Sequence, residues 1–481
     1  MTIPAEQREA AEYLAALTRG TVVETHISAV FLGRDEAFKL KKAVDLGFLN
    51  FTTLAERERL VKFEQALNAP NAPGLYLGAL PLTRGPDGGL RLGGDGPALE
   101  WVLRMRRLPP EAFLTGPMDP ALLDPIADAV VALHEAAPRR AGDGRMLRVI
   151  AGNREAALSA GLPEAQVQAW AEAALAMEAS LARFLSQRAA AGFLRRCHGD
   201  LHLGNICLIE GRPTPFDALE FDEDLATIDV GYDLAFLLMD LDLRQSRAMA
   251  NQVMNRYLAR TGDVALLRAL PLWLSLRALI RAHVAARSEQ DGTGLLKAAA
   301  GYLAPPPPRL VAIGGLQGTG KSYLARRLAP DLGAAPGAVV LRSDEIRKRL
   351  AGAAPETRLP AEAYTAEQSA AVFAEVNRSA AIALEAGHAV IADAVFQRAA
   401  EREALAALHL DFVGLWLEAP LDILRARIAN RKGDASDATV EVLESTAARD
   451  EGLVTWARFN AAEGTEAAAR KRLDLPATIS P

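Results

Sequence analysis

Residues 315–322 combine glycines, a lysine and a hydroxyl at the spacing of a phosphate-binding loop (Walker A motif). They read Gly-Leu-Gln-Gly-Thr-Gly-Lys-Ser and follow an apolar run, residues 310–313, that suits a buried strand. The glycines let backbone N–H groups turn toward phosphate oxygens, while Lys321 supplies a point charge and the Ser322 hydroxyl reaches Mg²⁺. We therefore expect ATP and Mg²⁺ as cofactors, bound by Gly315, Gly318, Thr319, Gly320, Lys321 and Ser322.

Charged residues follow two of the strands expected after this loop. Asp344 comes after a strand expected over residues 338–341, where its carboxylate can receive a proton from an acceptor hydroxyl. Arg347 can clamp an anionic group. Asp393 follows a strand expected over residues 389–392 and is the candidate for holding Mg²⁺ or its water. Because ligands gather at the carboxyl ends of parallel strands, we expect these side chains to lie near the phosphate-binding loop.

The C-terminal residues resemble those of the small P-loop kinases of the AAA-domain group, which are kin to gluconate kinase, zeta toxin, chloramphenicol phosphotransferase and polynucleotide 5′-kinase. The resemblance implies that Arg427 and Arg431 belong to a lid that covers the transferring phosphate. The alternative is a solvated helix face, since Arg425, Arg427 and Arg431 recur at helical spacing. We favour the lid, because a closing cationic segment suits phosphoryl transfer.

A second group of candidate residues lies in the first half of the chain, in Cys-His-Gly-Asp-Leu-His-Leu-Gly-Asn-Ile (197–206) and Phe-Asp-Ala-Leu-Glu-Phe (216–221). This pattern resembles the aminoglycoside phosphotransferase family and its protein-kinase-like relatives. The resemblance implies that Asp200 accepts or orients the acceptor proton, and that Asn205 and Asp217 bind Mg²⁺, with Glu220 as the second choice. Carboxylate and amide oxygens hold the cations that neutralise charge developing on the phosphates.

The same resemblance extends to Ala37-Phe38-Lys39, which looks like the kinase strand lysine that contacts the α/β phosphates. Glu64, on the helix that follows, is its expected ion-pair partner. Two alternatives stay open. Lys41 shares the strand face with Lys39, and Glu56 and Glu58 share the helix with Glu64, so a shift of register would move either role; a plain solvated lysine is the other reading.

Other polar residues near 200 favour structural roles. Asp233 is expected to cap a helix beginning at Leu234 and to brace the catalytic loop. A metal site of two cysteines and two histidines is rejected, because its spacing differs from the C-x₂₋₄-C and H-x₃₋₅-H pairs of structural zinc sites. The residues concerned are Cys197, His198, His202 and Cys207.

The order of expected elements predicts α/β and α+β domains. Short strands at 21–25, 29–32 and 37–41 and a helix at 54–67 indicate a small lobe, and mostly helical segments follow. Strands after residue 309 alternate with helices, which implies a parallel α/β sheet. We expect a protein-kinase-like bilobal domain at 1–303 (small lobe about 20–108, helical lobe about 109–303), a proline-rich linker at 304–309, and a P-loop kinase domain at 310–481.

Composition limits the partners. The chain has 481 residues and a net charge of −6, with a pI near 5.8, which argues against nucleic acid and acidic membranes as partners and favours small molecules. Two cysteines in so long a chain fit a reducing cytosol. The N-terminus lacks a signal-peptide pattern and no apolar run reaches about twenty residues, so we expect a cytoplasmic protein; the oligomeric state is left open.

These observations predict an ATP-dependent phosphotransferase with two nucleotide sites. The acceptors expected are hydroxyl groups of small molecules such as sugars, polyols or aminoglycoside-like compounds, and the family resemblance reports a fold rather than a substrate. In one alternative, the P-loop domain hydrolyses nucleotide and regulates the kinase-like domain. In two others, it acts on a nucleotide or polynucleotide end, or one half is a binding module that has lost catalysis.

Overall fold

The computed structural model describes residues 3–45, 50–430, 435–449, 452–462 and 464–477. The chain forms two compact units. The first comprises Met1–Met118, Ala132–Ala141 and Gly192–Asp233, and the second comprises Asp119–Val131, Gly142–Ala191 and Leu234–Pro481. All the N-terminal site candidates lie in the first unit, and all the candidates near the P-loop lie in the second.

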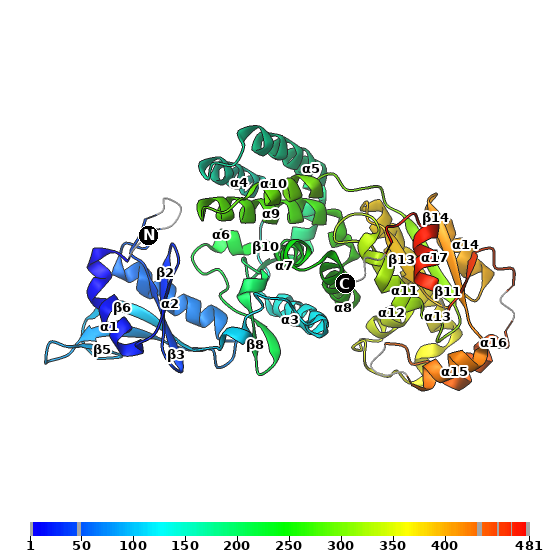
Figure 1. Cartoon of the computed structure of the whole chain (residues 1–481), viewed down its shortest axis with the longest axis horizontal. Coiled ribbons are helices and arrows are strands. Elements are labelled where there is room, and N and C mark those ends of the chain that lie inside the picture. Colours follow the sequence, from blue (N-terminus) through cyan, green and yellow to red (C-terminus); the bar gives the residue numbers. More distant parts are fainter. Residues whose placement is uncertain (1–2, 46–49, 431–434, 450–451, 463, 478–481) are drawn as a thin grey trace. The chain divides into compact units, whose positions relative to one another are not determined.

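The first unit contains a six-stranded antiparallel sheet in the order β1-β2-β3-β6-β4-β5 (Figure 1). In β3, Lys39 lies opposite Val30 on one side and Leu103 on the other. Helix α2 begins where the Thr53 hydroxyl accepts a hydrogen bond from the Glu56 N–H. The elements are α1 (Arg8–Thr18), β1 (Val22–Glu24), β2 (Ser28–Leu32), β3 (Glu36–Lys41), α2 (Leu54–Asn68), β4 (Tyr76–Arg84), β5 (Leu90–Leu92) and β6 (Ala98–Arg106).

Two short strand pairs carry the loops of the predicted catalytic segment. Strand β7 (Leu194–Arg196) pairs with β10 (Thr227–Asp229), and β8 (Ile206–Ile209) pairs with β9 (Arg212–Pro215), both antiparallel. Asp200 lies between β7 and β8, and Asp217 is the second residue after β9. The strands therefore place both loops within the first unit.

Helices make up most of residues 119–302, as the sequence predicts. Their apolar residues are extensively buried, for example along α9, where nine of the twelve buried residues are apolar. The helices are α3 (Leu123–Ala136), α4 (Leu147–Ser159), α5 (Glu164–Ala190), α6 (Glu223–Ala226), α7 (Val230–Arg244), α8 (Arg247–Thr261), α9 (Leu270–Arg287) and α10 (Thr293–Tyr302).

A five-stranded sheet follows, in the order β12-β13-β11-β14-β15, with every neighbouring pair parallel. Helices α11 and α17 share a core with its strands (Figure 1). This confirms the predicted parallel α/β sheet. The elements are β11 (Leu310–Gly315), α11 (Lys321–Leu328), β12 (Val339–Arg342), α12 (Ser343–Leu350), α13 (Ala366–Glu385), β13 (Val390–Asp393), α14 (Ala399–Ala406), β14 (Phe412–Glu418), α15 (Leu421–Ala429), α16 (Val440–Ala447), β15 (Ala457–Asn460) and α17 (Thr465–Arg472).

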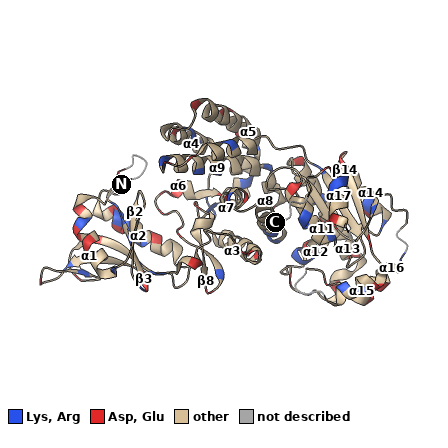
Figure 2. Ribbon diagram, in the orientation of Figure 1, with Lys and Arg blue, Asp and Glu red and all other residues tan. Residues whose placement is uncertain are grey.

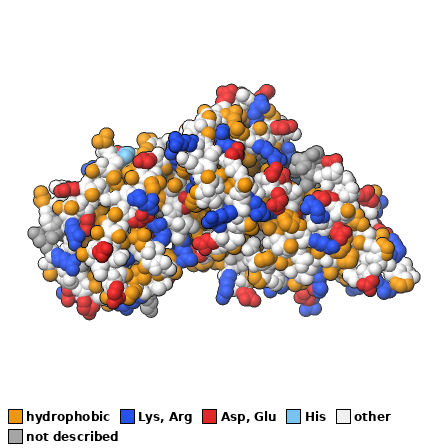
Figure 3. Space-filling model, turned by 180° about the vertical axis from the view of Figure 1, so that it is seen from behind, with side chains coloured by type: hydrophobic (Ala, Val, Ile, Leu, Met, Phe, Trp, Pro, Cys, Tyr) orange, Lys and Arg blue, Asp and Glu red, His pale blue; other side chains and the backbone are white. Residues whose placement is uncertain are grey.

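Basic and acidic residues are interspersed along the ribbon (Figure 2). On the face drawn in Figure 3, Lys and Arg side chains alternate with Asp, Glu and hydrophobic side chains. That face differs from the concentrated cationic surface that drives association with nucleic acid. None of the helices in the described part of the chain is both long and apolar enough to cross a lipid bilayer.

Helix α8 covers the edge strand of the parallel sheet. The Asn255 side chain accepts a hydrogen bond from the Val340 N–H at 2.6 Å and donates one to the Ala338 carbonyl at 3.2 Å. The buried Asn251 side chain donates to the same carbonyl at 3.0 Å. An exposed edge strand leaves backbone groups unpaired, so these two amides satisfy part of the edge of β12. Strand β12 leads directly to Asp344.

We expect Asn255→Leu to lower the free energy of unfolding by about 1–3 kcal/mol, because it leaves the Val340 N–H without its partner. Urea denaturation measures the change. The control is Gln187→Ala, an exposed amide on α5, which should change the free energy by less than about 0.5 kcal/mol. Equal effects of the two substitutions would show that the α8–β12 hydrogen bonds do not form in solution.

Candidate functional site

The loop that carries Asp200 is held by the buried carboxylate of Asp233. Its Oδ2 accepts a hydrogen bond from the His198 N–H at 3.1 Å, and its Oδ1 accepts one from the Gly199 N–H at 2.9 Å. His134 Nε2 lies 3.2 Å from Oδ2. These contacts confirm that Asp233 braces the loop.

The expected capping role of Asp233 is wrong. Helix α7 begins at Val230 rather than Leu234, so Asp233 lies in its first turn. Asp229 comes directly before the helix, and its Oδ1 accepts a hydrogen bond from the Gly231 N–H at 2.8 Å. The Asp233 carboxylate instead accepts hydrogen bonds from the buried amides of the loop.

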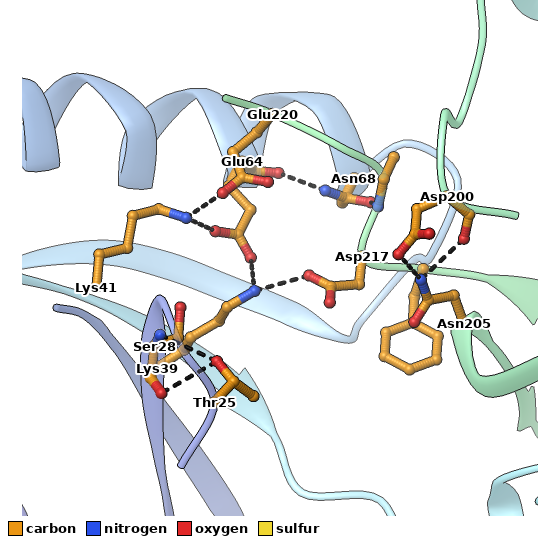
Figure 4. Close-up of polar contacts among 12 residues, drawn as sticks. Thr25, Ser28, Lys39, Lys41, Glu64, Asn68, Asp200, Asn205, Asp217 and Glu220 are labelled. Carbon is orange, nitrogen blue, oxygen red and sulfur yellow. Dashed lines mark hydrogen bonds and ion pairs between the residues drawn. The ribbon is translucent and has the colours of Figure 1, made fainter. Parts of the chain in front are cut away.

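Asp200 and Asn205 face each other across the loop between β7 and β8 (Figure 4). The Asn205 amide donates to the Asp200 carbonyl at 2.9 Å and to its Oδ2 at 3.0 Å. The Asp200 side chain is 43% exposed, so a substrate hydroxyl can reach it. The structure thus brings the predicted base and the predicted metal-binding amide together, and their chemical roles stay predictions.

Asp217 lies at the start of the next loop in a left-handed conformation, with φ of 60°. Its N–H donates to the Tyr76 hydroxyl at 2.9 Å. Its Oδ1 is 2.7 Å from the Lys39 ammonium (Figure 4). The carboxylate is 40% exposed, which suits a metal ligand. Glu220, the second choice for this role, is nearly buried and contacts Lys41 instead.

Lys39 and Glu64 form the ion pair that the sequence suggests, with Nζ and Oε1 2.7 Å apart. Burial opposes the charge on Lys39, but the charges of Asp217 and Glu64 more than compensate and raise its pKa well above the ordinary value. Burial likewise opposes the charge on Glu64, and the charges of Lys39 and Lys41 lower its pKa to about 2. Both groups are therefore charged at neutral pH, and a nucleotide-binding role for them stays a prediction.

The phosphate-binding loop follows β11 and leads into α11. Gly315, Gly318 and Gly320 all have positive φ, which favours glycine. A Cβ on Gly315 would lie 2.3 Å from the Leu417 carbonyl oxygen. The loop closes on itself, because the Thr319 hydroxyl and the Lys321 ammonium donate to the Leu316 carbonyl at 2.8 Å and 2.9 Å. This geometry fits the predicted phosphate-binding loop, whose binding role stays a prediction.

Asp393 lies at the carboxyl end of β13, beside the loop. Its Oδ2 accepts a hydrogen bond from the Ser322 hydroxyl at 2.5 Å and lies 3.4 Å from Arg342 Nε. A hydroxyl and a carboxylate oxygen are donors that Mg²⁺ prefers. Ser322 and Asp393 thus fit the predicted cation.

Asp344 lies in the first turn of α12, beyond the end of β12. Burial raises its pKa, and the charge of Arg342 and a hydrogen bond with Ser436 oppose that shift only in part. Arg347, on the same helix, donates to the Ala363 carbonyl at 2.7 Å and stacks on the Tyr364 ring at 4.8 Å. Asp344 is thus a carboxylate with the raised pKa that suits a general base.

Arg427 donates to the Ala461 carbonyl at 3.0 Å and to the Gly318 carbonyl of the phosphate-binding loop at 3.4 Å. Arg425 instead pairs with Glu444 at 3.0 Å on an exposed helix face. Arg431, the other predicted lid arginine, lies outside the described residues. The placement of Arg427 agrees with the lid hypothesis, which stays a prediction.

Of the C-terminal candidates that the structure describes, all except Gly315 and Thr319 line one open cavity of about 1030 Å³. The sequence reasoning missed several other lining residues, because they come from separate segments and share no spacing. Asp437 is one of them: it accepts hydrogen bonds from Lys348, the Leu359 N–H and the Tyr364 hydroxyl. The others include Arg326, Arg358 and Arg449.

Comparisons with known proteins agree with this geometry. Residues 56–273 match the phosphotransferase enzyme family, and residues 310–453 match an AAA domain. Uncharacterized proteins of Mycobacterium bovis (strain ATCC BAA-935 / AF2122/97) and Mycobacterium tuberculosis (strain ATCC 25618 / H37Rv) are each 31% identical over 471 residues, covering 92% of this chain and 92% of theirs. The chain belongs to the family of these mycobacterial proteins.

This family member carries two kinase-type domains and is a phosphotransferase enzyme that uses ATP. Choline kinase LicA from Streptococcus pneumoniae is 15% identical, with a TM-score of 0.40, and the match covers 63% of this chain and 99% of that chain. A sugar kinase from Janibacter sp. HTCC2649 is 20% identical, with a TM-score of 0.29, and the match covers 35% of this chain and 96% of that chain.

The hydrogen bonds of Asp233 make the stability of the phosphotransferase domain sensitive to substitution at this position. We expect Asp233→Ala to lower the free energy of unfolding by at least about 2 kcal/mol, because two buried N–H groups lose their acceptor. The matched control is Asp222→Ala, which also removes a carboxylate that accepts two N–H groups, but at an exposed helix start; its cost should be about 1 kcal/mol. Chemical denaturation that gives equal costs would contradict the bracing role.

Proposed function

We propose that the chain has two ATP sites, each transferring the γ-phosphate to a hydroxyl group of a small molecule such as a sugar, a polyol or an aminoglycoside-like compound. The supporting observation is a common arrangement in the two units. In each, a candidate metal-binding carboxylate contacts another candidate group of the nucleotide site: Asp217 contacts the proposed phosphate-binding Lys39 at 2.7 Å, and Asp393 contacts the proposed Mg²⁺ ligand Ser322 at 2.5 Å. The proposed domains are residues 1–303 and 310–481, joined by 304–309.

In the N-terminal site, Asp200 orients the acceptor hydroxyl and takes its proton as the new O–P bond forms. Lys39 holds phosphate oxygens through its ammonium, and Glu64 fixes the direction of that ammonium. Asn205 and Asp217 are the proposed ligands of Mg²⁺, which neutralises charge on the phosphates when bound.

In the C-terminal site, the amides of the phosphate-binding loop and Lys321 hold the β/γ oxygens. Asp344 takes the proton of the acceptor hydroxyl, and Arg427 covers the transferring group. Ser322 and Asp393 are the proposed ligands of Mg²⁺. The reacting phosphate thus lies between a general base and fixed cations, which is the arrangement that stabilises phosphoryl transfer.

A second candidate function has one observation in its favour. The α8–β12 hydrogen bonds join the P-loop sheet to a helix of the phosphotransferase family region. The P-loop site could then hydrolyse ATP and regulate the other domain without an acceptor of its own.

The small number of cysteines, both buried and free of disulfides, supports the proposed cytoplasmic location.

Mass spectrometry of a pooled library of sugars, polyols, aminoglycosides and nucleosides, incubated with ATP and Mg²⁺, tests the proposal. We expect wild type to yield two products that each gain one phosphate. Asp200→Ala should abolish one product and Lys321→Ala the other, because each removes a group from a different site. If Lys321→Ala instead abolishes ATP hydrolysis and no product depends on Lys321, the regulatory function is supported.

The raised pKa of Asp344 predicts the pH dependence of the P-loop site. The base must be ionised to take a proton, so the rate at this site should fall as pH decreases, with a midpoint above the ordinary range of aspartate. Asp344→Ala should lower the rate by about 10²–10⁴-fold and remove this titration. Initial rates in the Asp200→Ala background isolate the site, and an unchanged rate in Asp344→Ala would rule out the base.

A further inference from the structure

A second buried ion pair lies beside Lys39 and Glu64 in the first unit. The Lys41 ammonium is 2.6 Å from Glu64 Oε2 and also contacts Glu220 Oε1 (Figure 4). Glu64 therefore joins two lysines, with Oε1 toward Lys39 and Oε2 toward Lys41. The proposed nucleotide chemistry uses Lys39 and Glu64 but assigns nothing to Lys41 or Glu220.

These additional charges are costly to bury. The side chains of Lys41 and Glu220 are 1% and 6% exposed, and removing ions from water opposes folding unless their partners compensate. A buried pair is weak evidence for stability, since apolar residues of similar size often serve as well. The buried pair therefore calls for a role beyond filling the interior.

The position of Glu220 indicates that role. It lies three residues after Asp217, in a segment that docks on the small sheet and α2 through several bonds. The Asp217 N–H donates to the Tyr76 hydroxyl at 2.9 Å, and the Ala218 N–H donates to Asn68 Oδ1 at 2.8 Å. Glu220 adds the ionic attachment to Lys41 on β3.

Asp217 needs such support from its neighbours. Its φ of 60° is a left-handed conformation, which costs free energy for a residue other than glycine. In addition, two lysines face three carboxylates here. If Asp217 binds a cation, Lys39 remains paired with Glu64 and Lys41 with Glu220, so each lysine still has one carboxylate to balance its charge.

From these contacts we infer that Lys41 and Glu220 are positioning residues of the N-terminal nucleotide site. Their buried pair fixes the second oxygen of Glu64 and tethers the segment that carries Asp217 to β3. Lys39 and Asp217 are thereby held toward the same phosphates. The inference rests on the proposed function of this site.

The test uses the full chain with Lys321→Ala, which disables the P-loop site. Titration with a fluorescent N-methylanthraniloyl ATP analogue in Mg²⁺ measures the Kd, and hydrogen–deuterium exchange of peptides covering 216–221 measures the order of the tethered segment. We expect Glu220→Gln to raise the Kd by about 10–100-fold, the range for groups that orient metal ligands. The amides of Asp217 and Ala218 should exchange faster, while those of β3 stay protected.

The matched control is Glu100→Gln in the same background. Glu100 is also a buried carboxylate of the small lobe, 2% exposed, and its ion-pair partner is Arg57 at 2.9 Å. The Gln7 amide connects it to the backbone carbonyl of Lys41 rather than to the Lys41 ammonium. This substitution should reduce stability without changing the Kd or the exchange of the 216–221 peptides. Equal effects of Glu100→Gln and Glu220→Gln on both readouts would overturn the inference.

Two further outcomes are distinguishable. If the parent does not bind the analogue, the proposed function of the site fails, and the exchange measurement still decides the tether: unchanged exchange in Glu220→Gln overturns it, and faster exchange supports it. If Glu220→Gln does not fold, the double variant Lys41→Met/Glu220→Leu replaces the pair with apolar groups. It should show the same rise in Kd and the same faster exchange; wild-type values for both would overturn the inference.

Discussion

The N-terminal site depends on the ion pairs that the Glu64 carboxylate makes with two lysines. The carboxylate holds the two lysine ammonium groups in the interior of the first unit, one through each oxygen. A lysine without a partner at this depth would favour its neutral form. Because Glu64 keeps Lys39 charged and directed, the small sheet holds a fixed cation beside Asp217 in the proposed nucleotide site.

Both units must hold charged groups in fixed positions, and they do so by different means. The first unit holds its charged groups through buried ion pairs between side chains that are far apart in the sequence. The P-loop site relies on backbone amides in a glycine-rich turn and on side chains at the carboxyl ends of adjacent parallel strands. A motif of eight residues supplies most of the second arrangement, whereas the first needs a folded lobe.

The contacts of α8 give the P-loop sheet a direct connection to the preceding helices. Asn255 bonds the backbone of β12 at Val340, and Asn251 and Asn255 both bond the carbonyl of Ala338, directly before the strand. Since β12 leads into Asp344 and Arg347, any shift of α8 would bear on the residues proposed to meet the acceptor. A linker of four prolines therefore does not by itself make the P-loop domain mechanically independent.

The sequence by itself determined the phosphate-binding loop, the Asp200–Asn205 loop and the parallel sheet, because each rests on local spacing or hydrophobic periodicity. Only the tertiary structure decided which lysine and which acidic residue take which position. Lys39 and Asp217 are 178 residues apart, and the alternatives Lys41 and Glu220 have the same charges. Burial separated them: Asp217 stays exposed enough to reach a ligand, while Glu220 is enclosed with Lys41. Local sequence carries no information on enclosure by distant segments.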